Sequence, residues 1–158
     1  MDQLLLTLTV LAALGSGLIA GVFFAFSVSV MAALGRQPPA AGISAMQAIN
    51  VVIVNPLFLG AFMGTALIGV VLAIAAVMRW SYPGAAYLLA GGVLYVAGCF
   101  LLTMVCNVPL NNRLAAIRPD SVEGANFWRR YLVEWTNWNH ARTAASFAAA
   151  ACFIMALL

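Results

Sequence analysis

The chain consists of long apolar stretches joined by short connections that hold its few charged residues. No Asp, Glu, Lys or Arg occurs in residues 3–35, 37–78, 80–112 or 143–158. A helix needs about 20 apolar residues to cross the hydrocarbon core of a bilayer, so these gaps predict four crossings. The predicted spans are residues 4–34, 56–78, 85–106 and 138–158. The predicted fold is one all-α integral membrane domain over residues 1–158, an antiparallel bundle of four transmembrane helices.

Local signals mark the helix ends. Gly35, Pro38 and Pro39 end the first helix, and Asn55 followed by Pro56 is typical of an N-cap and a first helical position. Asp120 or Ser121 caps a further helix, which lies at the interface and leads directly into the last span. The pairs Gly17-x-x-x-Gly21 and Gly60-x-x-x-Gly64 fit close helix packing in lipid, although such pairs are common in apolar helices.

Composition excludes several classes of protein. The chain is 65% hydrophobic and 7% charged, whereas soluble domains carry about 25% charged residues. Its basic residues are all Arg and lie at predicted membrane edges, so no clustered surface for nucleic acid is expected. The three cysteines form no CxxC pair and lie in apolar helices, where a buried thiol is the expected role. The Met-Asp-Gln start lacks a basic signal-peptide region, so the first apolar stretch is expected to be a permanent span.

The distribution of arginine predicts the orientation. With four spans, the first and third connections share one side of the membrane, and both termini share the other side with Arg79. The first side holds six arginines: Arg36, Arg113, Arg118, Arg129, Arg130 and Arg142. By the positive-inside tendency this side is cytoplasmic and the termini lie outside, which predicts a multi-pass protein of the cell membrane.

Amide and aromatic side chains gather on that same side. Asn50 and Asn55 flank the start of the second span, and Asn107 and Asn111 lie at the end of the third. At about 100° per residue, one side of the last helix is predicted to hold Trp128, Tyr131, Trp135, Trp138, Asn139, Arg142 and Ser146. Thr103 aligns with Asn107 and Asn111 in the same way if Pro109 only kinks the helix. We expect both stripes to face the bundle interior, although an interfacial Trp/Arg belt with helix caps remains an alternative.

Two ionisable residues near this stripe have competing interpretations. Glu134 is four residues from Arg130, and a surface ion pair is its expected role. His140 is the only histidine and points away from the stripe, so a role as proton shuttle or base competes with a structural one. No His/Cys/Asp/Glu cluster has metal-ligand spacing, so no metal site is predicted, and haem or metal binding through His140 remains a minor alternative.

This constellation suits a flat apolar molecule that bears a carbonyl or phenolate. Tryptophan faces would stack on its rings, Arg142 would stabilise negative charge, and Asn amides would orient its oxygen atoms. The predicted catalytic residues are Asn107, Asn111, Asn139, Arg142 and His140. The predicted substrate contacts are Asn50, Asn55, Trp135, Trp138, Tyr131 and Thr103.

Three segments carry a family resemblance over essentially the whole chain. They are Met46-Gln47-Ala48-Ile49-Asn50 with Asn55-Pro56-Leu57-Phe58, Asn107-Val108-Pro109-Leu110-Asn111, and Trp135-x-x-Trp138-Asn139-x-x-Arg142-Thr143. Together they resemble the anthrone oxygenase-like membrane family, whose characterised fungal members oxidise an anthrone to an anthraquinone with dioxygen. The resemblance implies a role for Asn50, Asn55, Asn107, Asn111, Trp135, Asn139 and Arg142.

The chemistry implied by this resemblance needs no cofactor. Deprotonating a doubly activated carbon yields an electron-rich enolate that can reduce dioxygen directly. We therefore expect an oxygenase acting on a flat lipophilic aromatic or quinol-like substrate, with no cofactor favoured. The expected partners are the lipid bilayer and that lipophilic small molecule, and a homo-oligomer stays open. A non-catalytic membrane scaffold or subunit is the main alternative; a small transporter is less favoured because no charge lies mid-span.

Overall fold

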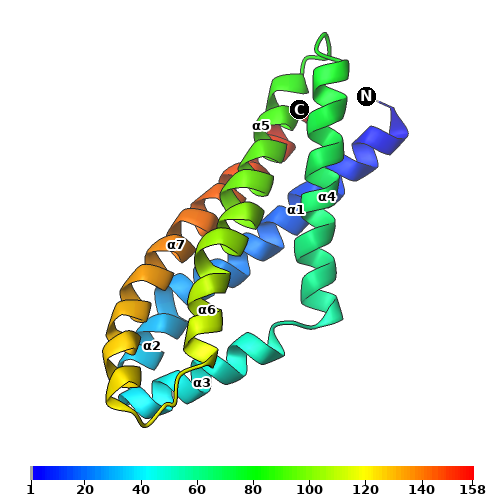
Figure 1. The fold of residues 1–158 in the computed structure, drawn as a ribbon. Coiled ribbons are helices and arrows are strands. Elements are labelled where there is room, and N and C mark those ends of the chain that lie inside the picture. Colours follow the sequence, from blue (N-terminus) through cyan, green and yellow to red (C-terminus); the bar gives the residue numbers. More distant parts are fainter. Residues whose placement is uncertain (1) are drawn as a thin grey trace.

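The computed structural model describes residues 2–158, and every element in that range is helical (Figure 1). The first long rod joins α1 (Gln3–Ala25), the π-helical turn η1 (Phe26–Val30) and α2 (Met31–Gly35). A short helix α3 (Pro39–Val52) precedes the second rod, α4 (Pro56–Met78). The third rod joins α5 (Ala85–Tyr95), the π-helical turns η2 (Val96–Leu101) and η3 (Thr103–Asn107), and α6 (Val108–Ala115). The fourth rod is one helix, α7 (Val122–Met155).

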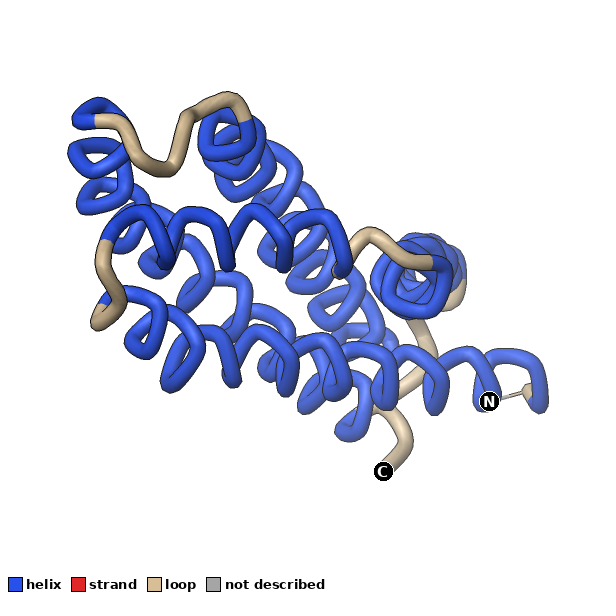
Figure 2. Tube along the Cα trace, turned by 90° about the horizontal axis from the view of Figure 1, so that it is seen from below, coloured by secondary structure: helices blue, strands red, loops and turns tan. Residues whose placement is uncertain are grey.

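The rods pack side by side, and α3 lies across one end of them (Figures 1 and 2). Helix α7 packs against α1 and α5, and α4 packs against the same two helices. In contrast, α3 packs against α2, α6 and α7. One buried apolar cluster runs through the rods and includes Phe62 and Phe153. A second cluster, which includes Ile43 and Trp128, lies at the α3 end.

Three of the rods are long and apolar enough to cross a membrane. They are residues Gln3–Gly35, Pro56–Met78 and Ala85–Ala115, so the chain is an all-helical membrane protein. Helix α7 is long enough to cross a membrane, but its mean hydropathy is lower than that of the three rods because its sequence includes Asn139, Arg142 and other polar residues. The fourth span and the antiparallel four-span bundle therefore stay predictions.

The predicted helix starts are confirmed by their caps. The Asn55 Oδ1 accepts from the Phe58 backbone N–H at 3.0 Å, and Pro56 is the first residue of α4. The Ser121 hydroxyl accepts from the Gly124 backbone N–H at 2.9 Å at the start of α7. Both caps satisfy a backbone donor that has no partner inside its helix.

The third rod is longer than predicted because it continues through Pro109 to Ala115. Proline has no N–H and its ring crowds the preceding turn of an α-helix. Here the wide π-helical turn η3 lies directly before Pro109, and the Val108 N–H donates to the Thr103 carbonyl five residues back. This wide turn accommodates the proline, so the rod continues and places Asn107 and Asn111 on one rigid element.

The two glycine pairs that fit close helix packing do not lie at helix contacts. A Cβ added at Gly17, Gly21, Gly60 or Gly64 would meet nothing within 4 Å, so these glycines lie on open faces. Close helix contacts use other glycines: a Cβ at Gly92 would lie 2.5 Å from the Gly69 carbonyl oxygen of α4. Sequence spacing alone does not distinguish a lipid-facing glycine pair from one at a helix contact, because both occupy apolar stretches.

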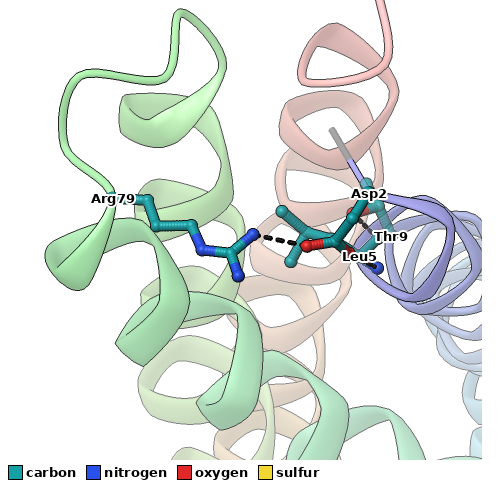
Figure 3. Close-up of polar contacts among 4 residues, drawn as sticks. All are labelled: Asp2, Leu5, Thr9 and Arg79. Atoms are coloured by element: carbon teal, nitrogen blue, oxygen red, sulfur yellow. Dashed lines mark hydrogen bonds and ion pairs between the residues drawn. The ribbon is translucent and has the colours of Figure 1, made fainter.

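The N-terminal end of α1 is tied to the end of α4 (Figure 3). The Asp2 carboxylate caps α1 by accepting from the Leu5 N–H at 2.9 Å, and it also accepts from the Arg79 guanidinium. These interactions, with the Arg79 contact the largest, lower the pKa of Asp2. The N-terminal residues and the second connection therefore lie at the same end of the protein, away from α3 (Figure 1).

Candidate functional site

A cavity of about 270 Å³ lies where α1, η1, α3, α4, η3, α6 and α7 approach one another. This is close to the lower end of ligand pockets, at about 300 to 1000 Å³. Five aromatic rings contribute to its wall: Phe23, Phe26, Phe58, Phe62 and Trp135. Four polar residues also line it: Asn50, Thr103, Asn111 and Arg142. A largely apolar chamber with a few polar groups suits a small lipophilic ligand that bears oxygen atoms.

Arg142 is a buried cation with no carboxylate partner among residues 2–158. The residue is only 5% exposed. The ion pairs within the described residues are formed by Arg79, Arg118 and Arg130, so none of them includes Arg142. The Asn139 Oδ1 accepts from Arg142 Nε at 2.9 Å and from Nη2 at 2.7 Å, and Nη1 donates to the Thr103 hydroxyl at 3.3 Å. Because these partners are neutral, the positive charge stays uncompensated at the cavity wall.

Aromatic faces and a fixed amide hold this guanidinium in place. Its Cζ lies 3.8 Å from the Phe23 ring centroid and 4.8 Å from that of Trp135. The Asn139 Nδ2 donates to the Phe23 carbonyl and to the Ser27 hydroxyl, each at 2.7 Å. With both amide ends engaged, Asn139 presents its oxygen to Arg142. The guanidinium is thus positioned before any ligand binds.

Asn111 is oriented by two donors from α7. Its Oδ1 accepts from the Tyr131 hydroxyl at 2.7 Å and from the Trp135 Nε1–H at 2.8 Å. Trp128, Tyr131 and Trp135 form a continuous stack, with ring centroids 5.5 and 6.1 Å apart. Because Oδ1 is occupied, the Asn111 amide has its N–H₂ group left to offer a ligand acceptor.

The predicted site residues fall into distinct locations. Those lining the cavity are Asn50, Thr103, Asn111, Trp135 and Arg142. Asn139 and Tyr131 lie behind this wall and hold Arg142 and Asn111. Asn107 is fully buried against α7, where its Nδ2 donates to the Trp135 carbonyl at 3.2 Å and its Oδ1 has no partner. It positions the helix turn that presents Trp135.

Three further predicted site residues lie away from the cavity and its supporting side chains. Trp138 is 43% exposed and His140 is exposed, because both lie at angles of α7 that face away from the other helices. Asn55 is a helix cap: besides its contact with Phe58, its Nδ2 donates to the Val52 carbonyl at 3.0 Å. Both ends of the Asn55 amide are therefore engaged at the helix cap, and Asn55 is not among the residues that line the cavity. Glu134 pairs with Arg130 at 2.6 Å, as predicted.

Sequence reasoning missed the aromatic residues of α1, η1 and α4 that line the cavity. Phe23, Phe26, Phe58 and Phe62 lie in uniformly apolar stretches, where a lipid-facing ring and a cavity-lining ring have the same sequence pattern. It also missed Ser27, which fixes Asn139. Ser27 lies in the π-helical turn η1, and such turns are frequent at functional sites.

The residues around the cavity do not form a metal-binding donor set. Residues 2–158 contain no group of three or more His, Cys, Asp or Glu side chains close enough to share an ion. The polar groups at the cavity are amides, a hydroxyl and a guanidinium, and the last of these repels cations.

The fold and site together define an all-helical membrane protein with an aromatic, guanidinium-bearing cavity. The sequence model described as anthrone oxygenase matches residues 57–152. The chain therefore belongs to the anthrone oxygenase family, as the resemblance predicted. The second and third segments lie within the matched residues, whereas residues 46–50 precede them. The match begins within α4 and ends within α7, so it includes Thr103, Asn111, Trp135 and Arg142. No curated protein matches the chain, and no solved structure matches it.

Proposed function

We propose that this protein is a membrane oxygenase that binds a flat lipophilic aromatic ketone of the anthrone type and oxidises it with dioxygen. The observation that carries the proposal is the buried Arg142 guanidinium, which lines an apolar cavity and has no carboxylate partner in the described part of the chain. A buried cation of this kind is stabilised when an anion binds beside it. The enolate of an anthrone is such an anion, and its rings match the aromatic wall.

The proposed topology has α7 as the fourth span, from about residue 138. The polar residues in the second half of α7 are turned inward: Asn139, Arg142, Thr143 and Ser146 are all buried. Apart from His140, near the start of the proposed span, the exposed positions there are apolar and include Phe147, Ile154 and Met155. Because the surface that would face lipid is apolar beyond His140, the inward polar residues do not prevent α7 from crossing the membrane.

In the proposed complex the substrate oxygen accepts hydrogen bonds from Arg142, and the rings lie against Phe23 and Trp135. The Asn111 N–H₂ group donates to a second acceptor on the ligand. These donors are already oriented by protein partners, so little reorganisation is needed when negative charge develops. Arg142 thereby lowers the pKa of the bound carbon acid by stabilising its conjugate base, and the proton leaves to water.

The proposed reaction converts the central CH₂ of the substrate to a carbonyl. The enolate carbon transfers electrons to dioxygen and forms a C–O bond. Cleavage of the O–O bond then leaves one oxygen atom in the new carbonyl and releases the other as water with the two hydrogens from carbon. Dioxygen is thus the oxidant, and the balance closes without another reductant. We propose that the protein needs no cofactor, consistent with a cavity whose side chains are not a metal donor set.

Turnover of anthrone by the purified protein in lipid nanodiscs tests this function. We expect one dioxygen consumed per anthraquinone formed, above the rate in empty nanodiscs, and one labelled oxygen in the product when ¹⁸O₂ is supplied. Arg142→Ala should lose at least about 100-fold in kcat, the usual effect of removing an oxyanion donor. Arg130→Ala, on the exposed face of the same helix, is the matched control.

A rate in the wild-type protein equal to that of empty nanodiscs would refute the oxygenase. A non-catalytic scaffold or subunit is then the main alternative, ahead of a small transporter, and its marker is loss of a partner complex in the Arg142→Ala variant.

A further inference from the structure

A second cavity lies on the outer side of the α3–α4 elbow, which we define as residues 48–59. It is a shallow, open cavity of about 300 Å³ and is lined by Ala48, Ile49, Val52, Ile53 and Asn55. Ile49 and Ile53 also line the inner cavity that holds Arg142. Two half-buried isoleucine side chains therefore separate the outer cavity from the inner one.

The outer surface of the elbow is apolar. Val51, Val52, Val54 and Leu57 are between 64% and 87% exposed. A contiguous exposed apolar surface in a membrane protein is expected to face lipid rather than water. The outer cavity consequently opens where a lipophilic molecule dissolved in the bilayer would meet the protein.

The elbow joins two helices that pack on different partners. Helix α3 packs against α2, α6 and α7, whereas α4 packs against α1 and α5. Asn55 links them, because its Oδ1 caps α4 while its Nδ2 donates to the Val52 carbonyl at the end of α3. This wall of the inner cavity is thus one layer of side chains on a short connection, without a further helix packed behind it.

From this arrangement we propose that the outer cavity is an access site through which the lipophilic substrate passes laterally from the bilayer, between Ile49 and Ile53, into the inner cavity. The proposal rests on the ligand class of the proposed function. It assigns the outer cavity a transient occupant, the flat aromatic substrate, because the two cavities share a wall and have similar volumes.

Adjacent valines on α3 give a matched test. Val52 lines the outer cavity and is 72% exposed, whereas Val51 lines neither cavity and is 74% exposed. Binding is followed in nanodiscs by stopped-flow quenching of tryptophan fluorescence with 9,10-anthraquinone, which requires no turnover. Val52→Phe should slow association and dissociation alike by about tenfold, within the range by which related complexes differ in association rate. The association rate of Val51→Phe should match that of the wild type. Ile53→Ala should speed association, because it removes part of the side-chain layer that separates the two cavities.

Equal rates for Val52→Phe and Val51→Phe would overturn the access site, and this is the result expected if the outer cavity holds only a lipid acyl chain. A faster rate for Val52→Phe would also overturn it. Wild-type protein that binds anthraquinone with these variant effects but does not oxidise anthrone would refute the oxygenase and leave the access site standing. Absence of anthraquinone binding by the wild type would overturn both.

Discussion

Replacing Asn139 by aspartate places a carboxylate directly against the Arg142 guanidinium. The substitution changes one amide nitrogen to oxygen, and the Asn139 oxygen already lies 2.7 and 2.9 Å from two Arg142 nitrogens. The new carboxylate would form an ion pair with the Arg142 guanidinium, which in the proposed mechanism stabilises the substrate enolate. We therefore expect Asn139→Asp to fold and to lose activity.

The magnitude follows from Coulomb attraction. Unit charges about 4 Å apart at an effective dielectric constant of about 20 interact by about 4 kcal/mol. If the substrate enolate must compete with the new ion pair, kcat/KM falls by up to about a thousandfold, at about 1.4 kcal/mol for each factor of ten. The variant also loses the two Nδ2 hydrogen bonds, at about 1 kcal/mol each, which the ion pair offsets. Its melting temperature should therefore stay within about 5 °C of the wild type.

The same helix offers a matched control. Asn126 accepts from Arg129 at 2.6 Å with the same three-residue spacing, on the exposed face of α7. Asn126→Asp makes the same chemical change far from the cavity, so its anthrone oxidation rate should match the wild type. An Asn139→Asp rate within about threefold of the wild type, a difference well below 1.4 kcal/mol, would refute the role of the uncompensated cation.

Three further substitutions test separate parts of the structure. Tyr131→Phe removes one of the two donors that orient Asn111. Because one hydrogen bond is worth about 1 kcal/mol, kcat/KM should fall about fivefold and the melting temperature by only about 2 to 4 °C; an unchanged kcat/KM would show that the Tyr131 hydroxyl does not orient Asn111. Asn55→Ala should lower the free energy of unfolding by about 1 kcal/mol through loss of the cap. Its dissociation constant for anthraquinone should stay unchanged, and a large increase would restore Asn55 as a ligand contact. Asp2→Asn keeps an acceptor for the α1 cap but removes the ion pair with Arg79. Because the pKa of Asp2 is lowered, the wild type has this stabilisation above the unfolded pKa near 3.8 and loses it as the pH falls through the lower folded pKa. Melting curves should therefore differ between the two proteins near neutral pH and converge in acid; a constant difference would contradict the assignment.

The sequence by itself determined the class of fold and most helix starts. Membrane helices depend on local composition, because any long apolar helix is stable in a bilayer when its backbone groups form hydrogen bonds within the helix. Helix caps also depend on local chemistry, which is why Asn55 with Pro56 and Ser121 were predictable. The 3.6-residue period of α7 then identified the face that holds Trp135, Asn139 and Arg142, and this face is buried.

Only the tertiary structure decided which of these side chains reach the cavity. Asn107 and Asn139 are buried like Arg142, yet they bond to the Trp135 and Phe23 carbonyls, partners that lie far from them in sequence. The cavity wall is completed by phenylalanines from other rods, and in an apolar helix nothing local distinguishes a ring that faces lipid from one that faces a cavity. Which atoms meet depends on how the rods pack and where their π-helical turns rotate the side chains, and these are properties of several helices together.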